Sequence, residues 1–244
     1  MSRRTSAELK QTLWERFGSP DHPAEWDGSI YGGGKLSQRF WEYFKAIELL
    51  DLQSDSVVLD IGGGSPVTGA GFFSSILAKA ARHVIVMDPE IAKAHNDNPA
   101  VTLVPYSASY DTLREVLLAH PKITHVSSIS VMEHIPADVR TGIMRAINEY
   151  FHGQSLVMTF EYHATERYFE HQLTTRTASE MTGYLTRYYL DTFDASPISC
   201  VDAIQSFQAV TSRKLRFLFP RLKFVSIQTP KWYPIALRFV ATSN

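Results

Sequence analysis

The chain has 244 residues, of which 44% are hydrophobic and 20% are charged, a composition typical of one globular domain. Its formal net charge of −1 gives no general electrostatic reason to expect nucleic acid or an anionic membrane as a partner. A single cysteine, Cys200, excludes an intrachain disulfide and any zinc site built from several cysteines. No apolar run approaches the 18 residues of a membrane span, so we expect a cytoplasmic protein.

The first 54 residues predict a helical cap placed ahead of the first strand. Thr5 to Glu8 has capping-box spacing, and apolar residues then follow at steps of four, which predicts a helix over 6–17. A loop rich in Pro, Gly and Asp follows, and helical spacing resumes over 35–50. This cap either covers a ligand or packs as an appendage.

The stretch Val57 to Ser65 is the most informative in the sequence. An apolar run that contains Asp60 passes at once into three glycines, Gly62, Gly63 and Gly64. The run predicts a strand buried on both faces, as in a parallel sheet, and the glycines predict a tight turn before a helix over about 69–81. Two phosphate-binding interpretations are weakened: a nucleotide P-loop needs a lysine that does not follow at the required distance, and the dinucleotide fingerprint has Val67 in place of its third glycine.

A second predicted strand, His83 to Met87, ends in Asp88 and Pro89. Nucleoside-binding α/β proteins place a carboxylate here because it can accept hydrogen bonds from both ribose hydroxyls. The spacing of 26 residues from Gly62 exceeds the usual figure of about 20, and the extra residues lie within 65–71. Alternatively, Asp88 only caps the helix that follows it.

Three more strands are predicted, over 101–104, 123–131 and 155–160, with helices over 111–120 and from Pro136 onward between them. The alternation of strand and helix indicates a parallel sheet with right-handed crossovers. The fourth strand runs into Ser130-Val131-Met132-Glu133-His134-Ile135, and the fifth runs into Glu161-Tyr162-His163.

The remaining third of the chain is less clearly patterned. The segment from 161 to 199 shows no sheet pattern and is rich in aromatic residues, so we expect a substrate-covering insertion, a self-packed subdomain or a subunit interface. A helix over 201–212 and two neighbouring strands, 222–228 and 235–241, are predicted to complete the domain. The basic residues between 213 and 223 are interpreted as a solvated face.

Two of these motifs together resemble the class I S-adenosylmethionine-dependent methyltransferases. Asp60, Gly62 and Gly64 match the D-x-G-x-G-x-G turn, with Pro66 in place of the last glycine, and residues 130–135 resemble the S-V-x-E-H-I turn of the small-molecule branch. The resemblance implies an α/β fold with a doubly wound, mostly parallel, seven-stranded Rossmann-like sheet whose last strand is antiparallel. Residues 1–54 would form the helical cap, and 55–244 the cofactor-binding core with an insertion at about 161–199.

The resemblance also implies S-adenosylmethionine as the cofactor. Tyr31, Gln38 or Arg39 would reach its methionine carboxylate. The family often has an acid near the adenine, where this chain offers Ser107, Ser109 and main-chain atoms. The full set of expected cofactor-binding residues is Arg39, Asp60, Gly62, Gly63, Gly64, Asp88, Pro89, Ser107, Ser130 and Val131.

The expected reaction is methylation of a small molecule, at oxygen rather than nitrogen or carbon. His134 or His163 would be the base, and Glu133 or Glu161 would orient it. These four residues have no recognised metal-ligand spacing, so no metal is expected. A sugar, a polyketide and a phenol remain open as acceptors, and a homodimer is open as well. The alternatives are a nicotinamide-dependent oxidoreductase and a non-catalytic binding module with the same fold.

Overall fold

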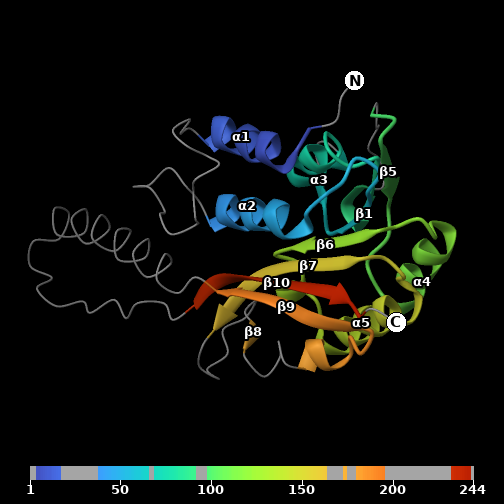
Figure 1. The fold of residues 1–244 in the computed structure, drawn as a ribbon. Coiled ribbons are helices and arrows are strands. Elements are labelled where there is room, and N and C mark those ends of the chain that lie inside the picture. The colour runs from blue at the N-terminus through green and yellow to red at the C-terminus, as the bar shows by residue number, and fades with distance from the viewer. Residues whose placement is uncertain are drawn as a thin grey trace, which may run out of the picture.

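The structure is a computed structural model, and its central feature is one mixed β-sheet covered by helices on both faces (Figure 1). It describes residues 4–17, 38–65, 69–91, 98–163, 173–174, 180–195 and 232–242. The main strands are β1 (Val57–Ile61), β4 (His83–Met87), β5 (Val101–Val104), β6 (His125–Ile129), β7 (Ser155–His163), β9 (Tyr188–Ala195) and β10 (Trp232–Ala241).

These seven strands lie in the order β5-β4-β1-β6-β7-β10-β9. The first five are parallel, and β10 is antiparallel to both of its neighbours. A two-residue strand, β8 (Leu173–Thr174), pairs with the carboxyl end of β7. The doubly wound, mostly parallel sheet with an antiparallel strand at 235–241 is therefore confirmed.

Two helical layers sandwich the sheet (Figure 1). The helices α1 (Ser6–Phe17), α2 (Gln38–Leu50) and α3 (Phe72–Leu77) cover one face, and α4 (Tyr110–Ala119) and α5 (Ala137–Tyr150) cover the other. Because side chains alternate along a strand, β1 directs Val58 into the core beneath α1 to α3 and Leu59 into the core beneath α4 and α5. The predicted N-terminal helices thus share a hydrophobic core with the sheet.

Short elements connect the carboxyl ends of the strands to the helices. The turn after β1 forms a small antiparallel hairpin, with β2 (Gly64–Ser65) paired to β3 (Gly69–Ala70). The 3₁₀ turns η1 (Pro89–Ile91) and η2 (Met132–His134) follow β4 and β6. This hairpin shortens the helix expected over 69–81: α3 begins at Phe72, because residues 69 and 70 are paired as a strand.

The expectation that 161–199 contributes nothing to the sheet is wrong. Residues up to His163 belong to β7, and β9 lies at the edge of the sheet, paired with β10. Aromatic side chains in this segment suit an edge strand as well as a substrate pocket. The segments predicted as a helix over 201–212 and a strand over 222–228 lie outside the described residues. No helix within the described ranges has the length and apolarity needed to cross a bilayer.

Candidate functional site

The carboxyl ends of β1 and β6 form the topological switch point of the sheet. From β1 the chain continues to β4 and β5 on one side, whereas β6 and β7 lie on the other. Ligands of open α/β sheets bind in the crevice outside this edge. Most of the expected site residues whose side chains are described gather here, on the turns that follow β1, β4 and β6.

Gly62, directly after β1, contacts the residues at the ends of β4 and β6. Its backbone has φ of +74°, a conformation that favours glycine, and its N–H donates to the carbonyl of Met87 at the end of β4 (2.8 Å). A Cβ on Gly62 would lie 2.3 Å from Cγ2 of Val131, which directly follows β6. The turns after β1 and β6 are therefore in contact, and no side chain larger than hydrogen fits between them.

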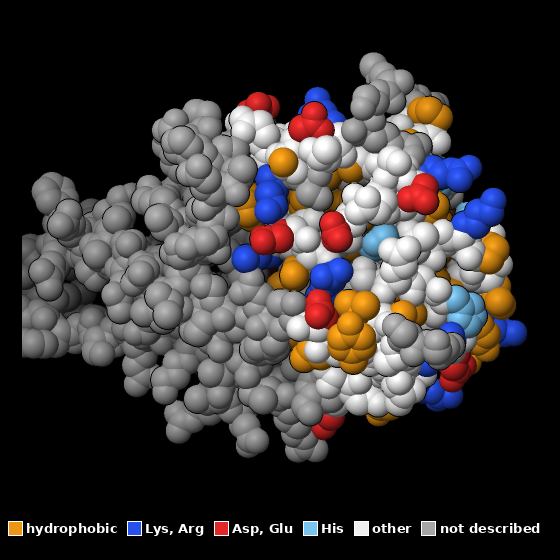
Figure 2. Space-filling view, viewed as in Figure 1, with side chains coloured by type: hydrophobic (Ala, Val, Ile, Leu, Met, Phe, Trp, Pro, Cys, Tyr) orange, Lys and Arg blue, Asp and Glu red, His pale blue; other side chains and the backbone are white. Residues whose placement is uncertain are grey.

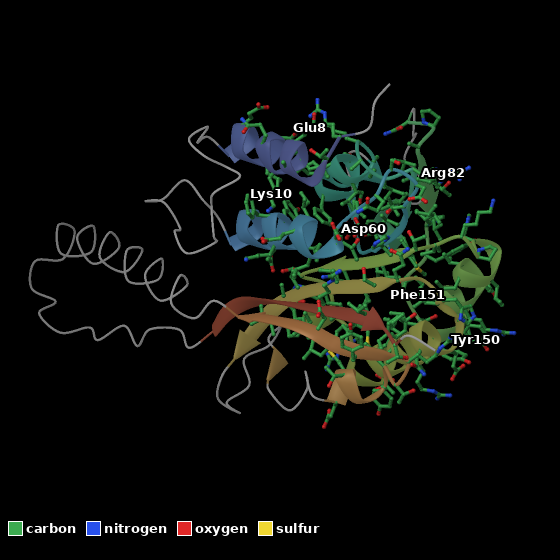
Figure 3. All side chains as sticks on the ribbon, viewed as in Figure 1. Glu8, Lys10, Asp60, Arg82, Tyr150 and Phe151 are labelled. Atoms are coloured by element: carbon green, nitrogen blue, oxygen red, sulfur yellow. The ribbon has the colours of Figure 1, made fainter. Side chains whose placement is uncertain are left out.

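Asp60 lies beneath the glycine turn, with only 1% of its surface exposed (Figure 3). Its Oδ2 accepts from Oγ of Ser74 on α3 (2.5 Å), and its Oδ1 accepts from Oγ of Ser127 on β6 (2.7 Å). Burial raises the pKa of Asp60 to about 6, against the lowering effect of these two hydroxyls. A Cβ on Gly63 would lie 2.2 Å from Oδ2 of Asp60, so the turn rests directly on this carboxylate.

Asp88 faces the glycine turn from the end of β4. Its Oδ2 accepts from the N–H of Gly64 (3.3 Å), and its Oδ1 accepts from the N–H of Glu90 (2.9 Å). The bond to Glu90 shows that Asp88 does cap η1, as the alternative interpretation held, while its other oxygen accepts from the glycine turn. The β2–β3 hairpin contacts η1 and accounts for the long spacing between Gly62 and Asp88.

The Asp88 carboxylate fits the sugar of a nucleoside cofactor. Each of its oxygens has two lone pairs and receives one backbone N–H. The remaining lone pair on each oxygen can accept from a ribose hydroxyl, while the two backbone bonds fix the orientation of the group.

A buried acid on α2 also reaches this edge of the sheet. Glu42 has no exposed surface, and its Oε1 accepts from Oγ of Ser130 (2.5 Å) and from Oγ1 of Thr159 (3.4 Å). Ser130 has φ of +51°, which is uncommon for a residue with a side chain. Strained backbone of this kind is often found at functional sites.

Sequence reasoning missed three members of these clusters: Glu42, Ser74 and Ser127. Each is a polar residue whose side chain is buried, and each bonds a partner at least 14 positions away in sequence. Polar residues at core positions are therefore the one signal that could have found them.

The candidate catalytic turn, η2, places its two residues differently. Glu133 is buried, with 4% of its surface exposed, whereas His134 is exposed. The turn is held by Arg140 of α5, whose Nη1 donates to the carbonyls of Met132 (3.2 Å) and Ile135 (2.6 Å). A buried guanidinium thus fixes the backbone on both sides of the expected catalytic pair.

The other expected site residues have mixed placements. Pro89 and Ser107 are exposed, on the turns after β4 and β5. Arg39 and Gln38 lie in the first turn of α2, and Glu161 and His163 in the last residues of β7, but their side chains are not among the described ones, and Tyr31 lies outside the described residues. Among the described side chains, no group of three or more His, Cys, Asp or Glu residues is arranged to hold a metal ion.

The charges on the face seen in Figure 2 are mixed. Acidic and basic side chains of the described residues alternate there, and those residues form no continuous basic strip on that face. This distribution agrees with the overall charge of −1.

No family model and no curated protein matches the sequence. Solved structures do match. The [4+2]-cyclase SpnF has a TM-score of 0.58 at 11% identity, over 100% of this chain and 98% of its own. Geranyl diphosphate C-methyltransferase from Streptomyces coelicolor A3(2), solved with S-adenosyl-L-homocysteine, has a TM-score of 0.54 at 10% identity, over 82% and 75%. The cyclopropane synthase MmaA2 from Mycobacterium tuberculosis has a TM-score of 0.52 at 12% identity, over 89% and 87%.

The identities of these three matches, 10–12%, are too low to carry an activity. The mixed, mostly parallel sheet covered by helices agrees with the fold of these neighbours. The chain therefore has the fold of the class I S-adenosylmethionine-dependent methyltransferases.

Proposed function

We propose that this protein is an S-adenosylmethionine-dependent methyltransferase that acts on a small molecule. The observation that carries the proposal is the Asp88 carboxylate at the carboxyl end of β4. It faces the glycine turn, and two backbone N–H groups hold it so that each oxygen keeps a lone pair for a ribose hydroxyl.

The chain's own residues would bind and align the reactants. S-adenosylmethionine supplies an already activated methyl group, so catalysis depends on placing the acceptor atom in line with it and removing a proton where the acceptor requires this. Gly62 and Val131 bring the turns after β1 and β6 into contact, which fixes the position of one turn relative to the other. The buried Arg140 holds η2 at the side of the crevice where the acceptor would lie.

A small-molecule acceptor is supported by the formal net charge of −1 and by the described residues on the face seen in Figure 2, which form no continuous basic strip for a polyanion. It is also supported by the fold neighbour that is named for methylating geranyl diphosphate. That neighbour transfers to carbon. For this chain we propose transfer to oxygen, because two histidine–glutamate pairs, Glu133–His134 and Glu161–His163, follow β6 and end β7 and could deprotonate a hydroxyl.

Binding of the cofactor product tests the proposal directly. Calorimetry with S-adenosylhomocysteine should show one site in the wild-type protein. Asp88→Ala should weaken that binding by at least about tenfold, because two charge-assisted hydrogen bonds to the ribose are lost. Asp55→Ala is the matched control, since Asp55 is an exposed acid that precedes β1, whereas the glycine turn follows the carboxyl end of that strand. Failure of the wild type to bind, or unchanged binding by Asp88→Ala, would overturn the proposal.

Turnover distinguishes an enzyme from a binding module. The protein should transfer a radiolabelled methyl group from S-adenosylmethionine to at least one acceptor in a panel of phenols, sugars and polyketides, and mass spectrometry should place it on oxygen. Tight cofactor binding without transfer to any acceptor would favour the binding module, and a methyl group on carbon would contradict O-methylation. Fluorescence titration with NADH should show no binding.

The choice of base is tested by exchanging each histidine in turn. His134→Asn should lower kcat by about 10²-fold if His134 is the base, with little change in affinity for S-adenosylhomocysteine. His163→Asn should then retain most of the activity. The opposite pattern would assign the base to His163, and full activity in both variants would show that alignment alone suffices.

A further inference from the structure

One serine hydroxyl beneath the glycine turn faces two acceptors. Oγ of Ser74 lies 2.5 Å from Oδ2 of Asp60 and 2.7 Å from the carbonyl oxygen of Gly63. A hydroxyl has a single hydrogen to donate. If Asp60 is ionised, that hydrogen can satisfy only one of the two contacts, and the other becomes a close approach of two oxygens without a hydrogen between them.

A proton on Asp60 resolves this conflict. With a hydrogen on Oδ2, Asp60 donates to Oγ of Ser74, and Ser74 donates to the carbonyl of Gly63. Ser127 continues to donate to Oδ1. The Gly63 carbonyl also accepts from the N–H of Gly71 at the start of α3 (2.6 Å), so both of its lone pairs are used. The observed distances therefore fit the protonated arrangement at every atom.

The surroundings of Asp60 favour the neutral form. α3 and β6 present the uncharged Ser74 and Ser127 to it, and the like-charged Asp88, which directly follows β4, also acts on it. α2 packs against β6 and brings Glu42, which accepts from Ser130 beyond the end of β6. Burial and the charge of Asp88 raise the pKa of Asp60 to about 6, so ionised and protonated forms are both accessible near neutral pH.

We propose that the cofactor-binding form of the glycine turn carries a proton on Asp60, and that Ser74 is a positioning residue that passes this hydrogen bond on to the Gly63 carbonyl. This inference rests on the proposed function, because the ligand is the cofactor bound by the turn. Ionisation of Asp60 releases the Gly63 carbonyl from Ser74 and loosens the turn. Cofactor binding near neutral pH therefore takes up a proton.

Calorimetry with S-adenosylhomocysteine measures this proton directly. We use the product because it lacks the sulfonium charge. At pH 7, titrations in two buffers of different ionisation enthalpy should show uptake of nearly one proton by the wild type. Between about pH 6.5 and 8 its affinity should fall by up to tenfold per pH unit. Asp60→Asn should show no uptake and a flat pH profile, because its amide donates permanently to Ser74.

Two serine variants separate positioning from packing. Ser74→Ala removes the link to Gly63 and should weaken S-adenosylhomocysteine binding and abolish proton uptake. Ser75→Ala is the matched control: Ser75 lies on the same helix, and its exposed hydroxyl bonds the carbonyl of Gly71 (2.9 Å). Proton uptake in this variant should equal that of the wild type.

The outcomes distinguish the two proposals. Binding with equal proton uptake in the wild type, Asp60→Asn and Ser74→Ala would overturn the role of Ser74 and leave the proposed function standing. Absence of S-adenosylhomocysteine binding by the wild type at every pH would overturn both. Should Asp60→Asn fail to fold, the proton uptake of Ser74→Ala compared with that of Ser75→Ala still tests the role of Ser74.

Discussion

Oγ of Ser130 donates a hydrogen bond of 2.5 Å to Oε1 of Glu42, and this contact ties helix α2 to the turn that follows β6. The two residues are 88 positions apart in sequence, and both are buried. Helix α2 is thereby attached to the carboxyl ends of the strands, where the cofactor is proposed to bind. Substitutions at this contact test how much it contributes to stability.

Glu42→Ala should lower the free energy of unfolding by about 1–3 kcal/mol, because the hydroxyls of Ser130 and Thr159 lose a buried acceptor. Urea denaturation followed by circular dichroism measures the change. Glu48→Ala on the same helix is the control. Its carboxylate is 45% exposed and pairs with Lys10 and Lys45, so its loss should cost less than about 1 kcal/mol. Equal losses in both variants would contradict a special role for Glu42.

Ser130 should respond differently to glycine and to alanine. Both substitutions remove the hydroxyl bond to Glu42, but only glycine relieves the backbone conformation at φ of +51°. Ser130→Gly should therefore be about 1 kcal/mol more stable than Ser130→Ala. Thermal unfolding of the pair measures the difference. An alanine variant as stable as the glycine variant would show that the turn relaxes without strain.

Gly62→Ala should destabilise the protein by about 2–4 kcal/mol, through a positive φ and a Cβ pressed against Val131. Adding Val131→Ala removes the two closest methyl groups. The double variant should regain the stability lost to the steric contact but not the stability lost to the positive φ. A double-mutant cycle by urea denaturation gives the coupling between the two positions. Additive effects would show that the turns after β1 and β6 do not depend on each other.

Asp60 should give stability a measurable pH dependence. Its pKa in the folded protein is raised from the ordinary 3.8 to about 6, so the folded state holds this proton more tightly than the unfolded chain does. The resulting stabilisation is complete below about pH 4 and is lost as the pH rises through about 6, which amounts to about 3 kcal/mol. Asp60→Asn cannot ionise, so its stability relative to the wild type should increase by about this amount between pH 4 and pH 7. Urea denaturation at several pH values measures the difference, and a constant difference would contradict the raised pKa.

Most of the fold was predictable because its elements have strong local patterns. The strands that begin at Val57, His83 and Val101 were predicted at their observed bounds, since parallel strands buried on both faces read as continuous apolar runs. The helix Ser6–Phe17 followed from its capping box and apolar spacing. The positions of Asp60 and Asp88 on either side of the glycine turn followed from the strand ends.

What sequence could not predict depends on contacts between distant residues. Strand β9 is held by its pairing with β10, more than 30 residues later, and its aromatic side chains did not distinguish a strand from an insertion. Asp60 was expected to bind the cofactor, but its bonds to Ser74 and Ser127 place it beneath the turn. Those bonds form only once α3 and β6 are assembled around β1. The Ser74→Ala variant tests whether Asp60 affects cofactor binding from that position.

The β2–β3 hairpin, finally, affects how proteins of this fold can be detected from sequence motifs. Its residues lengthen the interval in sequence between the glycines and Asp88, and yet the Asp88 carboxylate accepts a hydrogen bond from the N–H of Gly64. A sequence motif with a fixed spacing between the glycines and this acid would fail to match such a chain. A motif that places the acid at the end of the second strand, whatever the spacing, would match it.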